Sequence, residues 1–199
     1  MSTEREKESQ ILDAALEVFL RYGFKKATMG DIAKKAGMSR PSLYLVFSNK
    51  EDIFRAAITR KEEEFCEDTE RKLQQQSGLQ ERLYTVLETW LLEPYEMIRT
   101  SPESEELLSF AYTFAPDLRR QMLERMESQI LLAMDVVNTK KPISSQNGSK
   151  LTTKSLSRLI ALSTVEMKHS VQDAKELREL LEATAEIYAT HLERNVCAS

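Results

Sequence analysis

Apolar residues recur at three- and four-residue steps along most of the chain, which is the period of an amphipathic helix. The first stripe contains Ile11, Ala15, Val18 and Tyr22, and Gly23 follows it directly. Glycine commonly follows the last turn of a helix, so Gly23 is expected to end this one. No segment alternates apolar and polar residues in the manner of a strand. The pattern therefore predicts an all-α fold.

A short helix is predicted after this first one. Thr28 stands three residues before Asp31, which is the spacing of a capping box, and so opens a helix over Met29–Ala36. Gly37 follows, and glycine readily adopts the left-handed conformation that ends a helix. The prediction is a helix of about two turns that closes at Gly37.

Two further helix starts follow in close succession. Ser39 is predicted to cap a second short helix, which holds Pro41 in its first turn and continues through Phe47. Ser48 and Glu51 repeat the capping-box spacing and are expected to open a long helix.

This long helix changes character along its length. Beyond Thr59 it is highly polar, and ten of the thirteen residues in Arg60–Lys72 are charged. Such a segment is either solvated or packed along a narrow stripe, and Gln74–Gly78 is expected to end it. We therefore predict two domains, residues 1–60 and residues 61–199.

The second domain is also predicted to be helical. Its expected helices are Leu79–Thr100, Pro102–Phe114, Pro116–Asn138, Thr152–Lys168 and Val171–Asn195. Pro94 should kink the first of them, because proline removes one backbone donor and crowds the preceding turn. Thr139–Lys150 is rich in Pro, Ser, Asn and Gly and is predicted to be a mobile surface loop.

The charge of the chain is unevenly distributed. The formal net charge is −4, which argues against general coating of nucleic acid or of an anionic membrane. Residues 1–50, however, contain nine Lys and Arg against six Asp and Glu, a net +3, whereas residues 51–199 carry −7. A polyanionic partner is therefore expected to meet the N-terminal quarter.

Cysteine content and hydropathy indicate the compartment. Cys66 and Cys197 stand far apart in the sequence, with neither Cys nor His nearby, so neither a disulfide framework nor a zinc site is predicted. Met1–Gln10 is charged, unlike a signal peptide, and the best later apolar run, Leu159–Val165, is far shorter than the ~20 residues that cross a bilayer. We expect a cytoplasmic protein that does not enter a membrane.

The two short helices joined across Gly37 have the length and turn chemistry of a helix-turn-helix. The amphipathic helix before them supplies a packing surface, which completes a three-helix unit. In such units the N-terminal residues of the second short helix enter the major groove of DNA. Those residues are Arg40, Pro41, Ser42 and Tyr44. An ordinary helical hairpin inside a bundle is the alternative interpretation of this segment.

The segment TMGDIAKKAGMSRPSLYLVFSNKEDIF, Thr28–Phe54, resembles the DNA-binding signature of the TetR (tetracycline repressor-like) family. Thr, Asp-Ile-Ala, Ala-Gly, Ser, Leu-Tyr, Phe and Lys-Glu follow one another at that family's spacing. With the preceding helix the resemblance covers about residues 8–60, and the rest of the chain is similar only in length and helical character. The resemblance implies an N-terminal helix-turn-helix DNA-binding domain and a C-terminal helical ligand-binding and dimerisation domain.

The resemblance also implies roles for single residues. Arg40 and Ser42 lie where the family contacts base edges, and Pro41 lies where it touches a base or a thymine methyl group. Thr28 and Tyr44 lie where the family binds phosphates. An arginine can bind guanine through two hydrogen bonds, which discriminates by about 1–3 kcal/mol.

Three neighbouring positions need separate comment. Lys50 also lies where the family binds a phosphate. A cation in the first turn of a helix opposes the helix dipole by about 0.3–1 kcal/mol, so helix stability does not explain Lys50, whereas a phosphate would. The family often has a polar His or Tyr just before the Phe, whereas this chain has Leu45 and Val46 there. Leu45 is expected to contact either a thymine methyl group or the sugar–phosphate backbone.

Methionine and aromatic side chains recur at helical spacing in the second domain. Core packing explains such a pattern, and so does a ligand cavity, because flexible thioethers adapt to apolar ligands of varied shape. The resemblance implies a pocket between these helices. The candidate ligand-binding residues are Trp90, Tyr95, Phe110, Phe114, Met122 and Met126.

The last two predicted helices carry wide apolar stripes, part of which would remain exposed in a monomer. Leu159 lies in one stripe, and Leu180 and Ile187 lie in the other. The resemblance implies that these helices pair with those of a second subunit as a four-helix bundle. A two-fold dimer places two recognition helices about 34–36 Å apart, which is one turn of DNA, and so predicts a palindromic site.

The leading hypothesis is therefore a homodimeric transcription regulator, a repressor that a small apolar or amphipathic ligand releases from a palindromic operator on double-stranded DNA. The alternative is a ligand-independent architectural or division-linked DNA-binding protein of the same fold. An α-helical enzyme is a third hypothesis. The sequence has no nucleophile elbow, phosphate-binding glycine loop, paired-histidine metal motif or dinucleotide fingerprint. We expect no enzymatic activity, no cofactor and no bound metal.

Overall fold

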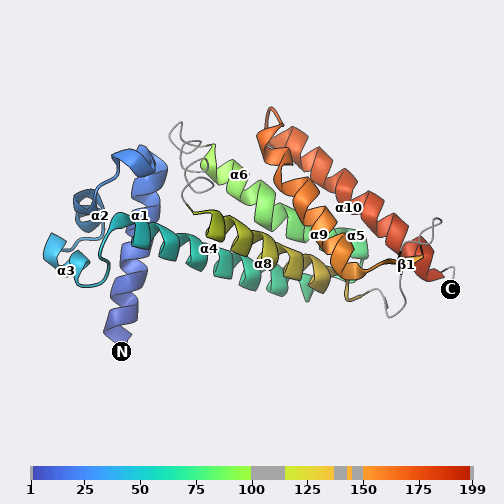
Figure 1. Ribbon diagram of the computed structural model, residues 1–199, viewed down its shortest axis with the longest axis horizontal. Helices are drawn as coiled ribbons and strands as arrows, with labels where there is room; N and C mark the ends of the chain where they lie inside the picture. The colour runs from blue at the N-terminus through green and yellow to red at the C-terminus, as the bar shows by residue number, and fades with distance from the viewer. Residues whose placement is uncertain (1, 100–114, 137–142, 145–149, 198–199) are drawn as a thin grey trace. The chain divides into compact units, whose positions relative to one another are not determined.

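A computed structural model describes residues 2–99, 115–136, 143–144 and 150–197 (Figure 1). The described residues form two compact units. The first extends to Glu63 and includes the described part of Ile98–Arg120; the second contains Glu64–Met97 and the described residues from Gln121 onward. The boundary in α4 thus lies three residues beyond the predicted division after residue 60. The first unit also takes in residues that the sequence assigned to the second domain.

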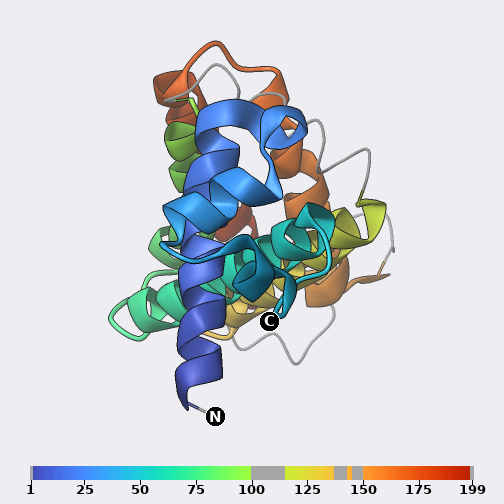
Figure 2. The same ribbon diagram turned by 90° about the vertical axis from the view of Figure 1, so that its left-hand side faces the viewer.

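Four helices build most of the first unit: α1 (Ser2–Lys26), α2 (Met29–Lys35), α3 (Arg40–Tyr44) and the first half of α4 (Lys50–Leu73). Figure 2 turns this unit toward the viewer, with α2 and α3 on the same side of α1. Gly23 has φ 75° and ψ 160°, which interrupts α1 at the point where the sequence predicted its end.

The predicted boundaries of α2 are confirmed to within one residue. Thr28 caps it through the full capping box: the Thr28 side chain accepts from the Asp31 amide, and the Asp31 carboxylate accepts from the Thr28 amide. Gly37 has φ 65°, the left-handed conformation expected of a residue that closes a helix.

The second short helix, α3, is shorter than predicted. Ser39 caps it as expected, by accepting a hydrogen bond from the Ser42 amide. The helix ends at Tyr44, whereas the sequence predicted that it continues through Phe47. At this point the Val46 amide donates to the Leu43 carbonyl oxygen, only three residues back, at 3.0 Å, which is the tighter bonding of a turn and not of an α-helix.

The predicted start of the long helix is wrong by one residue. The cap is Asn49 rather than Ser48, because the Asn49 Oδ1 atom accepts from the Asp52 amide at 2.8 Å. The Asn49 side-chain amide also donates to the Asp52 carboxylate at 2.9 Å. These two bonds fix the first turn of α4 from Lys50 onward.

The core of the first unit is a compact aromatic and aliphatic cluster. The rings of Phe19, Phe24 and Phe54 pack with centroids 5.2–5.6 Å apart. Ile32 and Leu43 are completely buried against this cluster. Leu43 thereby anchors α3, so that the rest of that short helix faces outward.

The second unit is built from helices with two short strands. Its elements beyond α4 are α5 (Leu79–Leu87), η1 (Glu88–Leu92), α6 (Glu93–Ile98), α8 (Pro116–Met134), β1 (Ile143–Ser144), β2 (Lys150–Leu151), α9 (Thr153–Val165), η2 (Met167–His169) and α10 (Ala174–Cys197). The described residues of the predicted Thr139–Lys150 loop lie in the antiparallel strands β1 and β2, which the sequence did not predict. The rest of that loop lies outside the described residues, as does the whole of the helix predicted over Pro102–Phe114.

The helix predicted over Leu79–Thr100 is interrupted immediately before Pro94. Residues Glu88–Leu92 form a π-helical turn between α5 and α6. Proline lacks the amide that would continue α-helical bonding, so a change of hydrogen-bond register close to Pro94 has a local cause. The expected disturbance is therefore a π turn, and it contains Trp90.

A buried arginine joins helix ends in the second unit. Arg82 of α5 is 8% exposed. Its guanidinium donates to the carbonyl oxygens of Leu73, the last residue of α4, of Gln76 just beyond it, and of Leu132 and Ala133 near the end of α8, at 2.5–3.1 Å. Carbonyls at helix ends carry partial negative charge, so they stabilise this buried cation.

No helix in the described ranges has the length and apolar content that a membrane span needs.

Candidate nucleic-acid interface and ligand site

The side chains of α3 divide into one anchor and several exposed groups. Leu43 is completely buried, whereas Arg40, Pro41 and Ser42 are exposed. Tyr44 is 53% exposed, and Leu45, the residue that caps α3, is 88% exposed. A leucine with so little burial contributes almost nothing to the core and is available for a contact outside the chain. The structure brings these five predicted residues onto one short exposed segment.

Intramolecular hydrogen bonds hold the hydroxyl groups of this surface. The Thr28 hydroxyl donates to the Asp31 carboxylate at 2.6 Å, and this bond is the main reason that the pKa of Asp31 lies below its usual range. The Ser42 and Ser39 hydroxyl oxygens lie 2.8 Å apart in a second hydrogen bond. Thr28 and Ser42 are therefore exposed but already oriented before any partner arrives.

Lys50 has partners that the sequence did not predict. Its ammonium group donates to the carbonyl oxygens of Phe24, Lys25 and Ala27 at 2.8, 3.2 and 3.1 Å. The dipole of α4 still does not explain Lys50, but its ammonium group caps the end of α1, so a phosphate is not needed to account for this residue. A phosphate contact by Lys50 has to compete with these three carbonyls. The pairing joins residues up to 26 positions apart and leaves no local pattern in the sequence.

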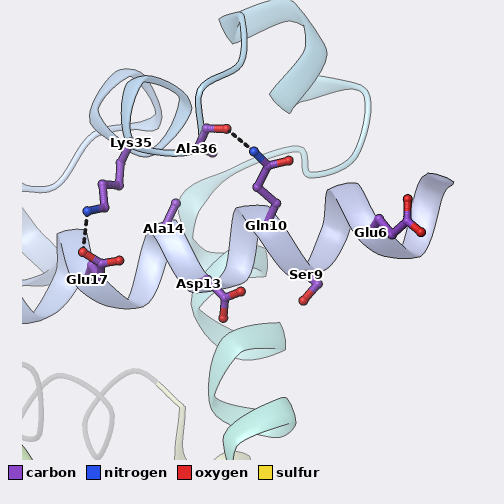
Figure 3. Close-up of a pocket in the computed structure, with 8 residues that line it drawn as sticks. All are labelled: Glu6, Ser9, Gln10, Asp13, Ala14, Glu17, Lys35 and Ala36. Carbon is purple, nitrogen blue, oxygen red and sulfur yellow. Dashed lines mark hydrogen bonds and ion pairs between the residues drawn. The ribbon is translucent and has the colours of Figure 1, made fainter. Parts of the chain in front are cut away.

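Two of the surface grooves on this unit are lined in part by Gln10 and Ala36. One, of about 640 Å³, places Lys7 and Glu8 of α1 beside Ser42, Leu45 and Val46. The other lies between α1 and the end of α2, where Gln10 donates to the Ala36 carbonyl and Lys35 pairs with Glu17 (Figure 3). Its remaining lining includes the carboxylates of Glu6 and Asp13, which disfavour a phosphate. The groove beside α3 is lined by Lys7 but also by the carboxylates of Glu4 and Glu8, so its charged side chains do not favour a polyanion either.

The predicted ligand-binding residues that the structure describes share one core. Trp90, Tyr95 and Met126 are buried in the cluster of the second unit, and Met122 packs against it. The Trp90 ring meets the Phe65 ring of α4 edge to face, with centroids 5.8 Å apart. Phe110 and Phe114 lie outside the described residues. Burial in one cluster fits both interpretations of these residues, core packing and a ligand cavity.

Several polar atoms inside this unit lack partners. Among the described residues, no group bonds to Trp90 Nε1, Thr69 Oγ1 or Gln129 Oε1, although all three side chains are more than 90% buried. Each unsatisfied buried polar group costs about 1–3 kcal/mol, so their persistence needs a cause such as a ligand or an ordered water. Of these three residues only Trp90 is recognisable from its sequence pattern, as an aromatic side chain at helical spacing.

Cys66 lies beside this polar group. Burial raises the pKa of the Cys66 thiol, and hydrogen bonds with Arg125 and Gln129 partly oppose this effect. The uncharged thiol form of Cys66 therefore prevails at neutral pH, and a thiol is a poor nucleophile.

Large apolar side chains remain exposed on the last two long helices. Leu159 and Leu162 of α9 are 49% and 43% exposed, and Leu180 and Ile187 of α10 are 40% and 66% exposed. Leu156, Ile160, Leu177 and Leu181 on the same helices are buried. Each helix thus covers the core with one side and presents apolar side chains on another.

Comparison with known proteins agrees with this architecture. The sequence profile of the bacterial regulatory proteins of the tetR family matches residues 11–57, which cover α1 to the start of α4. Residues 11–57 are therefore similar to the DNA-binding region of the tetR family. A TetR transcription regulator from Haloarcula marismortui has the same fold, with a TM-score of 0.70 at 19% identity over 94% of this chain and 98% of that one.

Two comparisons concern fatty-acid regulators. The fatty acid metabolism regulator protein of Bacillus subtilis is 36% identical over 87 residues, 44% of this chain and 45% of that protein. The structure of FadR from Bacillus subtilis in complex with stearoyl-CoA shares the fold, with a TM-score of 0.57 at 23% identity over 92% of this chain and 98% of that one. The chain spans about half the length of the curated relatives it matches.

Proposed function

We propose that this chain is a TetR-family transcription regulator that binds a palindromic operator as a homodimer. The observation that carries the proposal is the exposed segment from Arg40 to Leu45 on a helix-turn-helix unit anchored by Leu43. Arg40 and Ser42 contact base edges in this proposal, and Pro41 and Leu45 supply apolar contacts to thymine methyl groups. Thr28 and Tyr44 bind phosphates and fix the position of the unit on the duplex.

The homodimer is proposed from the apolar faces of α9 and α10. The exposed side chains of Leu159, Leu162, Leu180 and Ile187 are those expected at the centre of an interface between subunits. A two-fold axis pairs two recognition helices and makes the operator palindromic.

The regulating signal is proposed to be a small apolar or amphipathic molecule that binds in the second unit and releases the chain from DNA. The buried Trp90 and Met126 supply apolar surface, and the unpartnered Trp90 Nε1 and Gln129 Oε1 atoms supply polar contacts. FadR of Bacillus subtilis binds stearoyl-CoA, which makes a long-chain acyl-CoA the first probe for this chain. A coupling of about 1–3 kcal/mol would change DNA affinity about 5- to 150-fold.

Selection from genomic DNA, followed by footprinting at moderate salt, tests the DNA-binding proposal. We expect a protected palindrome, and we expect Arg40→Ala to relax base preference by about 1–3 kcal/mol. Arg158→Ala is the matched control, since Arg158 is an exposed arginine of α9 paired with Glu127. Protection of no palindrome would refute the proposal.

The single tryptophan of the chain allows a direct test of the ligand proposal. Stearoyl-CoA, with free coenzyme A as the control, is titrated while Trp90 fluorescence and operator affinity are recorded. A fluorescence change together with weaker DNA binding supports release by an acyl-CoA. Many dispersed DNA sites and no response to an apolar ligand panel would instead favour the ligand-independent architectural role.

Two further expectations, on enzymatic activity and on cellular location, accompany this proposal. The curated relatives are regulators by name, which supports the absence of enzymatic activity in this chain. A regulator of this kind has to reach DNA, so we also propose a cytoplasmic location.

A further inference from the structure

The guanidinium group of Arg40 lies directly against the backbone of Gly30, in the first turn of α2. A Cβ atom at Gly30 would stand 2.7 Å from Arg40 Nη2, 2.9 Å from Nε and 3.0 Å from Cζ. Cβ atoms in proteins essentially never approach other heavy atoms to less than 3.0 Å. A side chain at position 30 would therefore push the guanidinium away.

The backbone conformation of Gly30 does not require a glycine. Among the glycines that the structure describes, only Gly23 and Gly37 have positive φ. Gly30 lies inside α2, where glycine weakens the helix relative to alanine. Glycine matters at this position because it has no side chain, and not because its backbone is flexible. The Arg40 guanidinium occupies the space that a side chain would fill.

A carboxylate next to Gly30 favours the same placement. The pKa of Asp31 is lowered first by its hydrogen bond from Thr28, and the positive charges of Lys34 and Arg40 lower it further. Asp31 is thus ionised at neutral pH and attracts the Arg40 guanidinium toward the first turn of α2.

We propose that Gly30 is a positioning residue that sets the orientation of Arg40 and, through it, the base preference of α3. The inference rests on the proposed function, in which Arg40 contacts a base edge. A bidentate contact needs two aligned N–H groups, and recognition sites hold such groups to within about 0.5 Å. A Cβ at position 30 displaces the guanidinium by a comparable amount without changing any group that touches DNA.

The test is a double-mutant cycle on base preference. Wild type, Gly30→Ala, Arg40→Ala and the double variant are used to select binding sites from a random duplex pool. We expect Arg40→Ala to reduce preference at one position of each half-site roughly 5- to 150-fold. Gly30→Ala reduces preference at the same position, and the double variant matches Arg40→Ala alone, because both changes act through one side chain.

Two controls separate this role from a structural one. Gly30→Ala melts at or above the wild-type temperature, because alanine favours the helix. Gly78→Ala, whose Cβ would come no closer than 4.0 Å to Glu81, leaves base preference unchanged. Gly30→Ala also shifts the NMR resonance of the Arg40 Nε–H group in the free protein.

The inference is overturned if Gly30→Ala retains wild-type preference, or if it changes preference equally when Arg40 is absent. An unchanged Arg40 Nε–H resonance would overturn it as well. A wild-type protein that enriches no sequence refutes the proposed function and the base-preference role together. The resonance is measured without DNA, so it distinguishes that failure from an error about the Gly30–Arg40 contact.

Discussion

Lys50 stands in the first turn of α4, where the helix dipole disfavours a cation by about 0.3–1 kcal/mol. Its three bonds to carbonyls at the end of α1, together with a contact 4.5 Å from the Phe24 ring centre, offset that cost. We expect Lys50→Met to lower the free energy of unfolding by about 1–3 kcal/mol, measured by urea denaturation. Lys34→Met, on the exposed side of α2, should change it by no more than about 0.5 kcal/mol.

The same variant decides whether Lys50 also contacts phosphate. Because carbonyl oxygens already accept from the ammonium, we expect Lys50→Met to retain the wild-type slope of DNA affinity against salt concentration. A slope reduced by about one would demonstrate a phosphate contact instead.

Tyr84 of α5 links the stability of the second unit to alkaline pH. Burial, and then its hydrogen bond to the Glu88 carboxylate, raise the pKa of Tyr84 from 10.0 to about 12, although Arg178 opposes the shift. The folded state thus holds the phenol proton more tightly than the unfolded chain. The protonated Tyr84 therefore contributes to the free energy of unfolding. This stabilisation is complete below the unfolded pKa of 10.0 and is lost as pH rises toward about 12.

Tyr84→Phe removes the titrating group and should lack this part of the alkaline decline. The measurement compares urea unfolding of both proteins at about pH 9 and about pH 11. An identical decline in wild type and variant would contradict the assignment, and tyrosinate absorbance in the folded protein gives an independent pKa.

The predicted caps at Thr28 and Ser39 are confirmed, and each has a local cause. The exposure of Arg40 and Tyr44 follows from the burial of Leu43 between them on a short helix. The contacts of Arg40 with Gly30 and of Lys50 with Phe24 join different helices. Sequence periodicity describes one helix at a time, so it cannot specify such pairs.

At the scale of helices, the start of α4 shows how far capping rules reach. Ser48 with Glu51 and Asn49 with Asp52 have the same spacing, and the structure uses the second pair. We expect Asn49→Ala to cost about 1 kcal/mol of unfolding free energy, because it removes the N-cap. Ser48→Ala should cost no more than about 0.5 kcal/mol. Equal losses in both variants, measured by thermal unfolding, would contradict this assignment.

Arg82 fixes the ends of two helices at once, since its guanidinium donates to carbonyls at and just beyond the end of α4 and to carbonyls near the end of α8. Arg82→Met would leave several buried carbonyls without a donor. We expect a loss of about 3 kcal/mol or more in urea denaturation. Arg158→Met should lose less than about 1 kcal/mol, because the Arg158–Glu127 pair is largely exposed on its arginine side. A similar loss in both would show that the carbonyls are satisfied by water.

Arg82 stands three residues after Leu79 and one before Leu83, both buried, so a charged residue in an apolar stripe was a visible signal. Its partners were not visible, because the Leu132 and Ala133 carbonyls lie 50 and 51 positions away. Pro94 similarly indicated a disturbance, but not that it takes the form of a π turn over Glu88–Leu92.

At the scale of the whole molecule, α4 and α8 are covalent links between the two units, since each begins in one unit and ends in the other. Each end of α4 is held by hydrogen bonds within its own unit. Lys50 at its start donates to carbonyls at the end of α1, and the Leu73 carbonyl at its end accepts from Arg82. A helix held at both ends is suited to passing a displacement from the proposed ligand site to the proposed DNA-binding unit.

Assembly is the last property that the proposed function requires. Ile187 of α10 is 66% exposed, and burying such a side chain between subunits contributes about 1.5–3 kcal/mol in each copy. Ile187→Glu would place two carboxylates near the two-fold axis of an α9–α10 interface, and both would lose their water. We expect this variant to sediment as a monomer at concentrations where the wild type is a dimer, and to lose operator binding. Leu45→Glu is the matched control, since Leu45 is 88% exposed in the other unit. It should lose operator binding and remain a dimer, so a dimeric Ile187→Glu protein would place the interface elsewhere.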